Sequence, residues 1–483
     1  MRVSEINLRP IGDSVELQAQ VDTAMLPAPF RLWYRFPSSL QPRIDAGAGD
    51  FLVAALLLPA MKTGEPVNLP VPVSPALAHS LKWIQTIYRA WDPTLSVADV
   101  QTPLRRETAP EGTEVGLFFS SGVDSFYSLL KNGQDHPLNE DVIDSLIVIY
   151  GADIYLSDGK QTVFEQLLAN ARVIADHYGK RLLPVVTNVK ELLSCYGIRR
   201  GFIGHGTTLF SVGLALEGVF RKIFISAGNT YNDLVPTGIH PLLDPLWSTE
   251  SCRFMNDGLE AGRLEKTRLI ARSELAMNTL RVCWAKESLA YNCGRCSKCF
   301  RTILALHVIG ALDRCGTLPH TVDLETLRNL PLLTSYEEEL FFEEIMDAMG
   351  GSETDTAIRL ALEEGLAKRR RYFARLAEAK RSIKRTIPTN EQFILVDQDG
   401  VRHEFGMGRR VIPFLENEGP PAEDQTAIEE LERLRNAGAR FMVFWWSDFW
   451  WLEHYKELNR HLRRKYPCVL ENESLVVFDL REA

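Results

Sequence analysis

One segment constrains the fold of this chain more than any other: an apolar run at residues 115–119 that ends in Ser-Ser-Gly-Val-Asp-Ser at 120–125. The apolar run is typical of a buried strand, and the apolar spacing that follows it is typical of a helix. Small residues at a strand-to-helix turn let the backbone approach a ligand, and the unpaired N–H groups that open a helix favour an anion. The segment therefore predicts a phosphate-binding turn, which we call the serine turn.

The side chains of the serine turn suit a nucleoside triphosphate. Three serine hydroxyls add hydrogen-bond donors, and Asp124 supplies a carboxylate of the kind that holds Mg²⁺ beside phosphates. The turn lacks the Gly-Lys-Ser/Thr ending of a Walker loop, so the pattern does not favour ordinary P-loop phosphoryl transfer. A plain serine-capped helix is the alternative interpretation.

Strand and helix patterns alternate over residues 109–320. The further predicted strands are at 145–150, 181–186 and 222–226, and the predicted helices are at 163–178 and 207–220. Such alternation predicts an α/β fold, a parallel sheet with helices on both faces, in which ligands bind at the carboxyl ends of the strands. The serine turn, Tyr150-Gly151 and Gly228-Asn229 each follow a predicted strand, so we expect them at that edge.

Changes in pattern divide the rest of the chain. The predicted parts are a small β-rich domain at 1–108, the α/β domain at 109–320, a helical segment at 321–388 and a second α/β domain at 389–483. Proline and glycine near residue 110 and Pro388 mark the boundaries. We interpret the basic stretch at 368–385 as a solvated helix face rather than a tRNA contact, and the aromatic cluster at 445–451 as packing.

Composition narrows the function classes. The 483 residues are 45% hydrophobic and 24% charged, which is typical of a soluble globular protein. The net charge of −9 argues against general affinity for nucleic acid or anionic membranes. The first residues do not resemble a signal peptide, and no apolar run reaches the roughly 18 residues that a membrane span needs. We expect a cytoplasmic protein that does not enter a membrane.

Three cysteines at two-residue spacing, Cys293, Cys296 and Cys299, predict a metal site. Together with Cys283, ten positions upstream, they would form the closed tetrahedral shell of a structural zinc site. The alternative fourth ligands are Cys252, Cys315 and His307. An iron–sulfur cluster is the alternative to zinc, because ferredoxins use the same spacing. The fourth cysteine and the lack of a redox-partner motif favour zinc.

The serine turn and the four cysteines together resemble the family of 7-cyano-7-deazaguanine synthase, whose members are N-type ATP pyrophosphatases with the loop pattern Ser-Gly-Gly-x-Asp-Ser. The resemblance covers residues 112–312, and Ser121 stands where that pattern has its first glycine. It implies an adenine-nucleotide alpha-hydrolase-like fold, with ATP, Mg²⁺ and Zn²⁺ as cofactors. It also implies a ligase that transfers AMP from ATP to a carboxylate, releases pyrophosphate and forms an amide or a nitrile.

The resemblance also implies which residues act. Those expected to hold the triphosphate and magnesium are Ser120, Ser121, Gly122, Val123, Asp124 and Ser125, with Ser120, Asp124 and Ser125 expected in catalysis. The residues expected beside the adenine, from the strand-end argument alone, are Tyr150 and Gly151. The candidate substrate contacts, chosen as polar loop or helix-start residues, are His205, Asn229, Asp233 and His240. Lys266 and Arg268 could reach a phosphate, but we favour the interpretation that they lie on an exposed helix face.

The sequence leaves two other functions open. The chain could adenylate a macromolecule, either a protein terminus in a defence system or a tRNA. It could instead be a non-catalytic nucleotide-binding scaffold whose outer domains recruit partners, although Asp124 and Ser125 favour an enzyme. The expected partners are a small carboxylate and ammonia or another amine, and the aromatic tail leaves an oligomer open.

Overall fold

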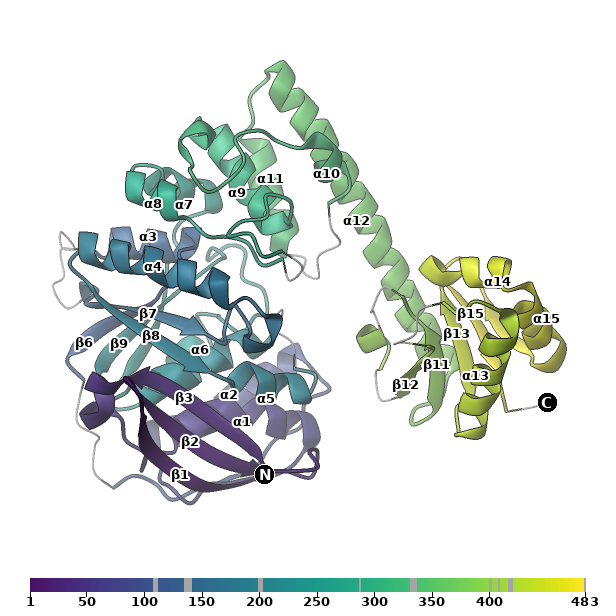
Figure 1. Cartoon of the computed structure of the whole chain (residues 1–483), viewed down its shortest axis with the longest axis horizontal. Coiled ribbons are helices and arrows are strands. Elements are labelled where there is room, and N and C mark those ends of the chain that lie inside the picture. Colours follow the sequence, from purple (N-terminus) through teal and green to yellow (C-terminus); the bar gives the residue numbers. More distant parts are fainter. Residues whose placement is uncertain are drawn as a thin grey trace. The chain divides into compact units, whose positions relative to one another are not determined.

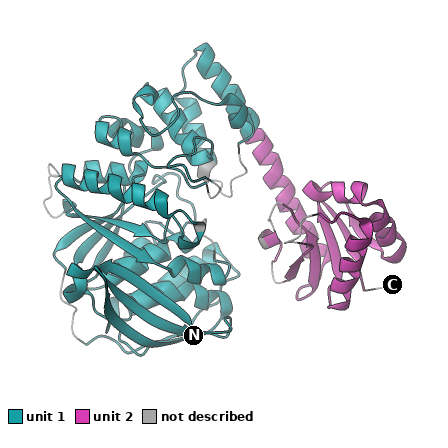
Figure 2. Ribbon diagram, in the orientation of Figure 1, with its two compact units in different colours: residues 1–365 teal, residues 366–483 magenta. Residues whose placement is uncertain are grey.

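The structure of the chain is a computed structural model. It describes residues 1–106, 112–133, 141–198, 203–285, 288–330, 337–398, 402–406, 409–415 and 420–481. These residues form two compact units, residues 1–365 and 366–483 (Figure 2). Each unit combines one sheet with helices, so the chain is α/β as expected.

The first unit is built on a mixed sheet of ten strands (Figure 1). In spatial order these are β10 (Arg253–Asp257), β9 (Phe220–Ser226), β6 (Glu114–Phe118), β7 (Ser145–Tyr150), β8 (Arg181–Thr187), β3 (Phe30–Pro37), β2 (Ser14–Asp22), β1 (Arg2–Ile11), β4 (Val67–Asn68) and β5 (Val100–Gln101). The first five strands are parallel, which confirms the pattern predicted for the middle of the chain. The sheet as a whole is mixed because β3 pairs with β8 in the antiparallel sense.

Residues 1–106, the described part of the segment 1–108 that was expected to form a small domain, share this sheet with the residues that follow them. Tyr34 of β3 lies opposite Thr187 of β8, and one hydrophobic core extends from Val15 of β2 to Ile223 of β9. The two compact units divide at residue 365, inside the long helix α12 (Glu353–Thr386). Among the described residues, the α/β part and the amino-terminal strands therefore form one body.

Alternating side chains of the parallel strands face two cores. Leu146 and Val148 of β7 lie in one core, and Ile147 and Ile149 lie in the other. The helices of this unit before α12 are α1 (Asp50–Thr63), α2 (Pro75–Trp91), α3 (Val123–Lys131), α4 (Gln161–His177), α5 (Val189–Cys195), α6 (His205–Ala215), α7 (Arg263–Ile270), α8 (Glu274–Thr279), α9 (Ser297–Val308), α10 (Leu324–Arg328) and α11 (Glu337–Asp347). Helices α1, α2, α5 and α6 cover one face, and α3, α4, α8 and α9 cover the other, as expected for helices on both faces.

Helix α1, nearly all of whose side chains are buried, lies in the first of these cores. Within the part of the chain that the structure describes, no helix has the length and apolar character needed to cross a membrane.

The second unit has a five-stranded sheet between two layers of helices. Its strands in spatial order are β12 (Arg410–Pro413), β11 (Gln392–Val396), β13 (Phe441–Trp445), β15 (Leu475–Asp479) and β14 (Cys468–Glu471). The end of α12 packs on one face, and α13 (Asp424–Asn436), α14 (Trp450–His454) and α15 (Lys456–Lys465) pack on the other. Trp445 and Trp451 are buried in these two cores, which fits the packing interpretation, whereas Trp450 is partly exposed.

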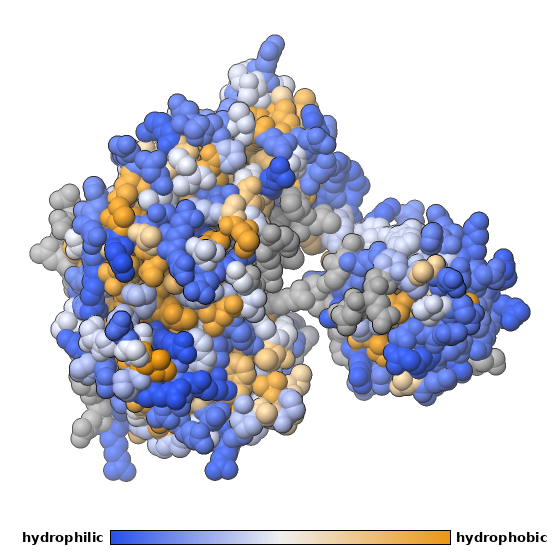
Figure 3. All heavy atoms as spheres, viewed as in Figure 1, coloured by the Kyte–Doolittle hydropathy of each residue, from blue (hydrophilic) through white to orange (hydrophobic). Residues whose placement is uncertain are grey.

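The basic stretch at 368–385 lies on α12, and several of its charges are already engaged. Lys380 pairs with Glu404 at 2.9 Å, Arg381 pairs with Glu378 at 2.6 Å, and Arg369 is buried. On the face seen in Figure 3, the surface of this unit is mostly hydrophilic. The two ion pairs fit the expected solvated helix face, whereas the buried Arg369 does not.

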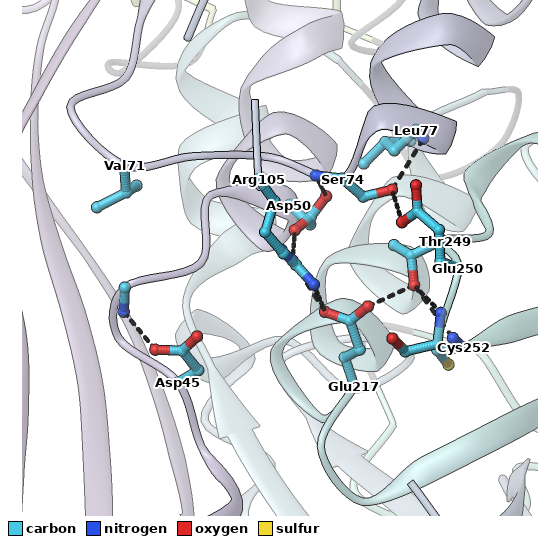
Figure 4. Close-up of polar contacts among 12 residues, drawn as sticks. Asp45, Asp50, Val71, Ser74, Leu77, Arg105, Glu217, Thr249, Glu250 and Cys252 are labelled. Carbon is cyan, nitrogen blue, oxygen red and sulfur yellow. Dashed lines mark hydrogen bonds and ion pairs between the residues drawn. The ribbon is translucent and has the colours of Figure 1, made fainter. Parts of the chain in front are cut away.

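A polar network in the first unit ties the amino-terminal residues to the parallel strands (Figure 4). Arg105 forms ion pairs with Asp50 at the start of α1 and, at 3.0 Å, with Glu217 after α6. The hydroxyl of Ser74, the residue that caps α2, donates to Glu250 at 2.6 Å. Separation of these partners would leave buried charges unpaired, which costs free energy. The network therefore holds the amino-terminal residues against the rest of the unit.

Asp244, in the loop before β10, is a buried carboxylate without a cationic partner in the contacts described. It accepts hydrogen bonds from the backbone N–H of His240 at 2.8 Å and from the side-chain amide of Asn256 at 2.7 Å. Burial raises the pKa of Asp244 to about 7, although both hydrogen bonds oppose this shift. Asp244 therefore gives up its proton in the folded protein only near neutral pH.

Asp244→Asn should remove a pH dependence of stability. Between its unfolded value near 4 and its folded value near 7, native Asp244 keeps a proton that the unfolded chain has lost, so native stability falls as pH rises. Asn remains neutral, and Asn256 Oδ1, unpaired among the described residues, can accept from it after an amide flip. By urea unfolding, we expect the variant to gain about 3 kcal/mol over wild type between pH 5 and pH 8. Parallel pH profiles for the two proteins would contradict this prediction.

Candidate nucleotide site and metal centre

The serine turn has the strand–turn–helix setting that its sequence predicts. β6 ends at Phe118, and α3 begins after Gly122, its N-cap residue, at the carboxyl edge of the parallel strands. Ser125 Oγ donates to the carbonyl of Gly122 at 3.1 Å and lies 3.5 Å from Ser120 Oγ. Ser120 and Ser125 thus lie on the two sides of one tight turn.

Ser121 adopts an unusual backbone conformation in this turn. Its φ of +57° lies in the left-handed region, where a residue with a side chain meets steric strain that glycine avoids. This conformation accounts for the preference for glycine at the same position of the family pattern. The side chain of Val123 packs in the core, so this residue can offer a ligand only its backbone N–H.

Asp124 lies in the first turn of α3 and faces several cationic side chains. Arg263 approaches its carboxylate at 3.2 Å and Lys266 at 3.6 Å. Burial alone would raise the pKa of Asp124, but Arg263, Lys266, Arg301 and Lys298 together outweigh burial and lower the pKa to about 2. The carboxylate is therefore ionised throughout the physiological pH range.

The cations beside Asp124 are themselves withdrawn from solvent. The side chains of Arg263 and Lys266 are only 2% and 1% exposed, and Arg301 is also buried. Lys266 Nζ also donates to the carbonyl of Ala227, just after β9, at 2.7 Å. Buried cations at the edge of a sheet form a strong anion site, because low local polarity strengthens their attraction for phosphate.

Helix α11 fixes two of these cations. The ring of Phe341 lies under both guanidinium groups, at 5.1 Å from Arg263 and 4.1 Å from Arg301. The carboxylate of Glu344 accepts from the backbone N–H groups of Arg263 at 2.9 Å and Leu264 at 3.0 Å, at the start of α7. Residues beyond the region of family resemblance thus shape the cationic cluster.

Sequence reasoning missed most of this cluster. The interpretation of Lys266 as part of an exposed helix face is wrong, because Lys266 is buried beside Asp124; Arg268 of the same helix is exposed. Arg263 and Arg301 were not predicted at all. The positions of these two arginines in the sequence could have indicated the site. Arg263 opens a helix after a strand end, and Arg301 follows Cys299, the last cysteine of the predicted metal site, by two residues.

Tyr150 and Gly151 follow β7 at the same edge of the sheet as the serine turn. The ring of Tyr150 stacks on Phe164 of α4, with 4.5 Å between ring centroids. Gly151 has a φ of +100°, and a Cβ atom there would lie 1.8 Å from the carbonyl oxygen of Thr187. A close approach to β8 thus requires this glycine, and a role beside adenine stays a prediction.

Three of the candidate substrate residues lie in loop or helix-start positions, as expected. His205 begins α6, with its Nε2 4.0 Å from the carboxylate of Asp153. The side-chain amide of Asn229 donates to the carbonyl of Asp233 at 3.1 Å, so these two residues close one turn. Their roles toward a substrate stay predictions.

The fourth candidate, His240, is a packing residue in its visible contacts. It is buried, its ring lies 5.0 Å from that of Trp91, and its Nδ1 accepts from the backbone N–H of Leu242 at 3.1 Å. Burial lowers the pKa of His240, which disfavours its charged form. Its contacts therefore give no support for substrate binding.

The four cysteines of the predicted metal site converge. The sulfur atoms of Cys283, Cys293, Cys296 and Cys299 all lie within 4.8 Å of one another. Cys296 Sγ is 3.5 Å from Cys299 Sγ and 3.9 Å from Cys283 Sγ, and Cys293 Sγ is 3.8 Å from Cys299 Sγ. These distances far exceed an S–S bond, and all four are free thiols. The cluster is therefore positioned to bind one metal ion.

Cys283 is the fourth member of this cluster, as predicted. The alternative fourth ligands have other partners: Cys315 Sγ lies 3.7 Å from Thr317 Oγ1, and His307 Nε2 lies 2.8 Å from Asp355. Cys252 is buried in the core on the other face of the sheet.

Comparisons with models of protein families, with curated proteins and with solved structures give no match to this chain. The case for its function therefore depends on the site itself.

Replacement of a cysteine inside the cluster should lower metal affinity, whereas replacement of a cysteine outside it should not. Purified wild-type protein is expected to carry one metal ion per chain, and Cys283→Ser should lower metal affinity at least about tenfold because the shell loses a ligand. Cys315→Ser, at a buried cysteine outside the cluster, is the matched control and should bind metal as wild type does. Elemental analysis after dialysis against a series of zinc-buffering chelators measures both affinities, and equal zinc affinity of Cys283→Ser and wild type would contradict the assignment.

Proposed function

We propose that the chain is an ATP-dependent adenylating ligase that activates a carboxylate as an acyl-AMP and then forms an amide or a nitrile. The observation that carries the proposal is the ionised Asp124 at the start of α3, next to the buried cations Arg263 and Lys266. A strand-to-helix turn with small residues, a carboxylate and buried cations can hold a triphosphate together with magnesium. This is the arrangement implied by the resemblance to 7-cyano-7-deazaguanine synthase.

Each part of the site has a role in this proposal. The hydroxyls of Ser120 and Ser125 and the N–H groups that open α3 bind phosphate oxygens. Arg263 and Lys266 turn from Asp124 to the phosphates when the nucleotide enters, which leaves the carboxylate of Asp124 able to hold magnesium. Magnesium, when bound, neutralises charge on the phosphates. An exchange of partners of this kind avoids unpaired buried charge before and after binding.

The proposed reaction has two steps. A carboxylate oxygen of the substrate attacks the α-phosphorus, the bond between the α-phosphorus and its bridging oxygen breaks, and pyrophosphate leaves. The N–H groups of the serine turn and the cations stabilise the charge that develops on the phosphate oxygens. Ammonia or another amine then attacks the acyl carbon, loses a proton and displaces AMP, which yields the amide. A nitrile would need a second ATP: the oxygen of the ammonia-derived amide attacks the α-phosphorus, pyrophosphate leaves, and loss of AMP and of the remaining N–H protons forms the C≡N bond. No side chain needs to act as a covalent nucleophile.

We infer zinc at the four cysteines. A tetrahedron with Zn–S bonds of about 2.3 Å has S–S edges of about 3.8 Å, close to the 3.5–3.9 Å separations of the thiols. In an iron–sulfur cluster the four thiolates are divided among two or four irons, so at least some of their sulfur atoms must lie farther apart than on one ion. Four protein ligands leave no open position, so this zinc would be structural.

Because all eight cysteines are free thiols, we also propose a cytoplasmic protein.

Pyrophosphate release tests the proposal. With Mg·ATP, ammonium and a panel of small carboxylates, wild type should release pyrophosphate and AMP in equal amounts. Asp124→Ala should be slower by about 100-fold or more, because it removes the magnesium ligand and leaves two buried cations unpaired. Equal release by both proteins, or release of ADP and phosphate instead, would refute the ligase.

Two positions on α7 give a matched pair for phosphate binding. Arg263→Gln should weaken ATP binding about tenfold or more, because it removes a buried, charge-assisted hydrogen-bond donor. Arg268→Gln removes an arginine from the exposed face of the same helix and should leave binding unchanged. Titration calorimetry measures both affinities, and equal effects of the two substitutions would place the nucleotide elsewhere.

A further inference from the structure

The serine turn is held from outside by the segment that enters the metal centre. The backbone N–H of Arg281 donates to the carbonyl of Ser121 at 2.8 Å. The carbonyl of Arg281 also lies close to Gly122, since a Cβ atom on that glycine would be 3.6 Å from it. Cys283, a member of the metal cluster, follows two residues later. The segment 280–283 therefore connects the strained residue of the turn to a metal ligand.

Asn292 braces this segment with all the hydrogen bonds of one carboxamide. Its Oδ1 accepts from the N–H groups of Val282 at 2.9 Å and Cys283 at 3.1 Å. Its Nδ2 donates to the carbonyls of Leu280 at 2.9 Å and Thr317 at 3.1 Å. Because Asn292 immediately precedes Cys293, it joins the Cys283 side of the metal centre to the Cys293 side.

A left-handed residue with a side chain persists only where its surroundings determine its conformation, because the conformation itself is unfavourable. For Ser121, one such determinant is the hydrogen bond from Arg281. The position of Arg281 depends in turn on Asn292 and on the attachment of Cys283 to the other three thiols through a shared ion. Without that ion, the segment keeps the hydrogen bonds of Asn292, the hydrogen bond from Thr317 Oγ1 to the carbonyl of Leu280 at 2.8 Å, and packing, but loses the attachment of Cys283.

We infer that metal binding at the four cysteines, transmitted through Asn292 and Arg281, holds the serine turn in its phosphate-binding shape. Asn292 is accordingly a positioning residue for the nucleotide site. The inference rests on the proposed function only for its nucleotide readout. The order of the turn is a property of the protein without ligand and can be measured separately.

The first test is hydrogen–deuterium exchange on three forms of the full chain: metal-loaded, stripped with a chelator and desalted, and reloaded with zinc. Stripping should speed exchange at 119–125 and 280–283, and reloading should reverse it. Peptides from β7 and β13 should exchange alike in all three forms. Unchanged exchange at 119–125 in metal-free protein would overturn the inference. Equally faster exchange in β7 would also overturn it, because the metal would then stabilise the whole unit.

The second test uses Asn292→Ala with Asn188→Ala as the matched control. The carboxamide of Asn188 braces β3 in a similar way, accepting from the N–H of Trp33 at 2.9 Å and donating to the carbonyl of Arg31 at 2.8 Å. Asn292→Ala should bind zinc about 10- to 100-fold more weakly, as expected for loss of a group that orients a ligand, and should show faster exchange at 119–125. Asn188→Ala should change neither readout, and equal effects of both substitutions would overturn the assignment to Asn292.

Binding of Mg·ATP, titrated after removal of the chelator, separates the inference from the proposed function. We expect affinity to fall at least about tenfold in the stripped protein and to return with zinc. If the metal-loaded protein binds no ATP while exchange at 119–125 still responds to zinc, the coupling stands and the proposed function fails. If Asn292→Ala does not fold, the stripped and reloaded wild-type protein decides the question alone.

Discussion

The parallel pairing of β6 between β9 and β7 is the constraint on which the rest of the first unit depends. A central strand must pair its N–H and C=O groups on both sides, so its ends are fixed by its neighbours. When pairing stops after Phe118, the chain leaves the sheet at the edge where the neighbouring strands also end. The serine turn and the start of α3 lie at this point. The position of the turn therefore determines where the contacts of the candidate site form.

The buried cationic side chains near the serine turn need a negative group beside them. Arg263, Lys266 and Arg301 lie out of solvent, and buried cations are tolerated only with counter-charge or strong hydrogen bonds. In the ligand-free protein, Asp124 supplies part of that compensation, and its lowered pKa is the measurable sign of it. Helix α11 contributes through Phe341 and Glu344, which gives the segment after the metal centre a part in shaping the site.

The sequence predicted those features that depend on neighbours along the chain. Strand and helix periodicity located β7 and α4 because each element carries its own pattern, and the spacing of Cys293, Cys296 and Cys299 predicted their convergence. Features that depend on distant pairing were not predictable. The antiparallel contact of β3 with β8 merges residues 1–106 into the larger sheet. Arg301 comes close enough to lower the pKa of Asp124 only through the packing of α9. A helix of mixed polarity does not reveal which of its charges is buried, as Lys266 and Arg268 illustrate.

Ser121 connects these levels of organisation. A glycine at this position would adopt φ near +57° without steric strain, so serine makes the turn less favourable by roughly 1–2 kcal/mol unless other contacts compensate. One contact that can compensate for this strain is the hydrogen bond from the backbone N–H of Arg281 to the carbonyl of Ser121. The segment that contains Arg281 is held by Asn292 and ends at Cys283, a member of the cysteine cluster. A turn that is strained by itself and stabilised from outside is more sensitive to that external support than a relaxed glycine turn. The serine at this left-handed position therefore makes the four-cysteine cluster more important for the shape of this loop.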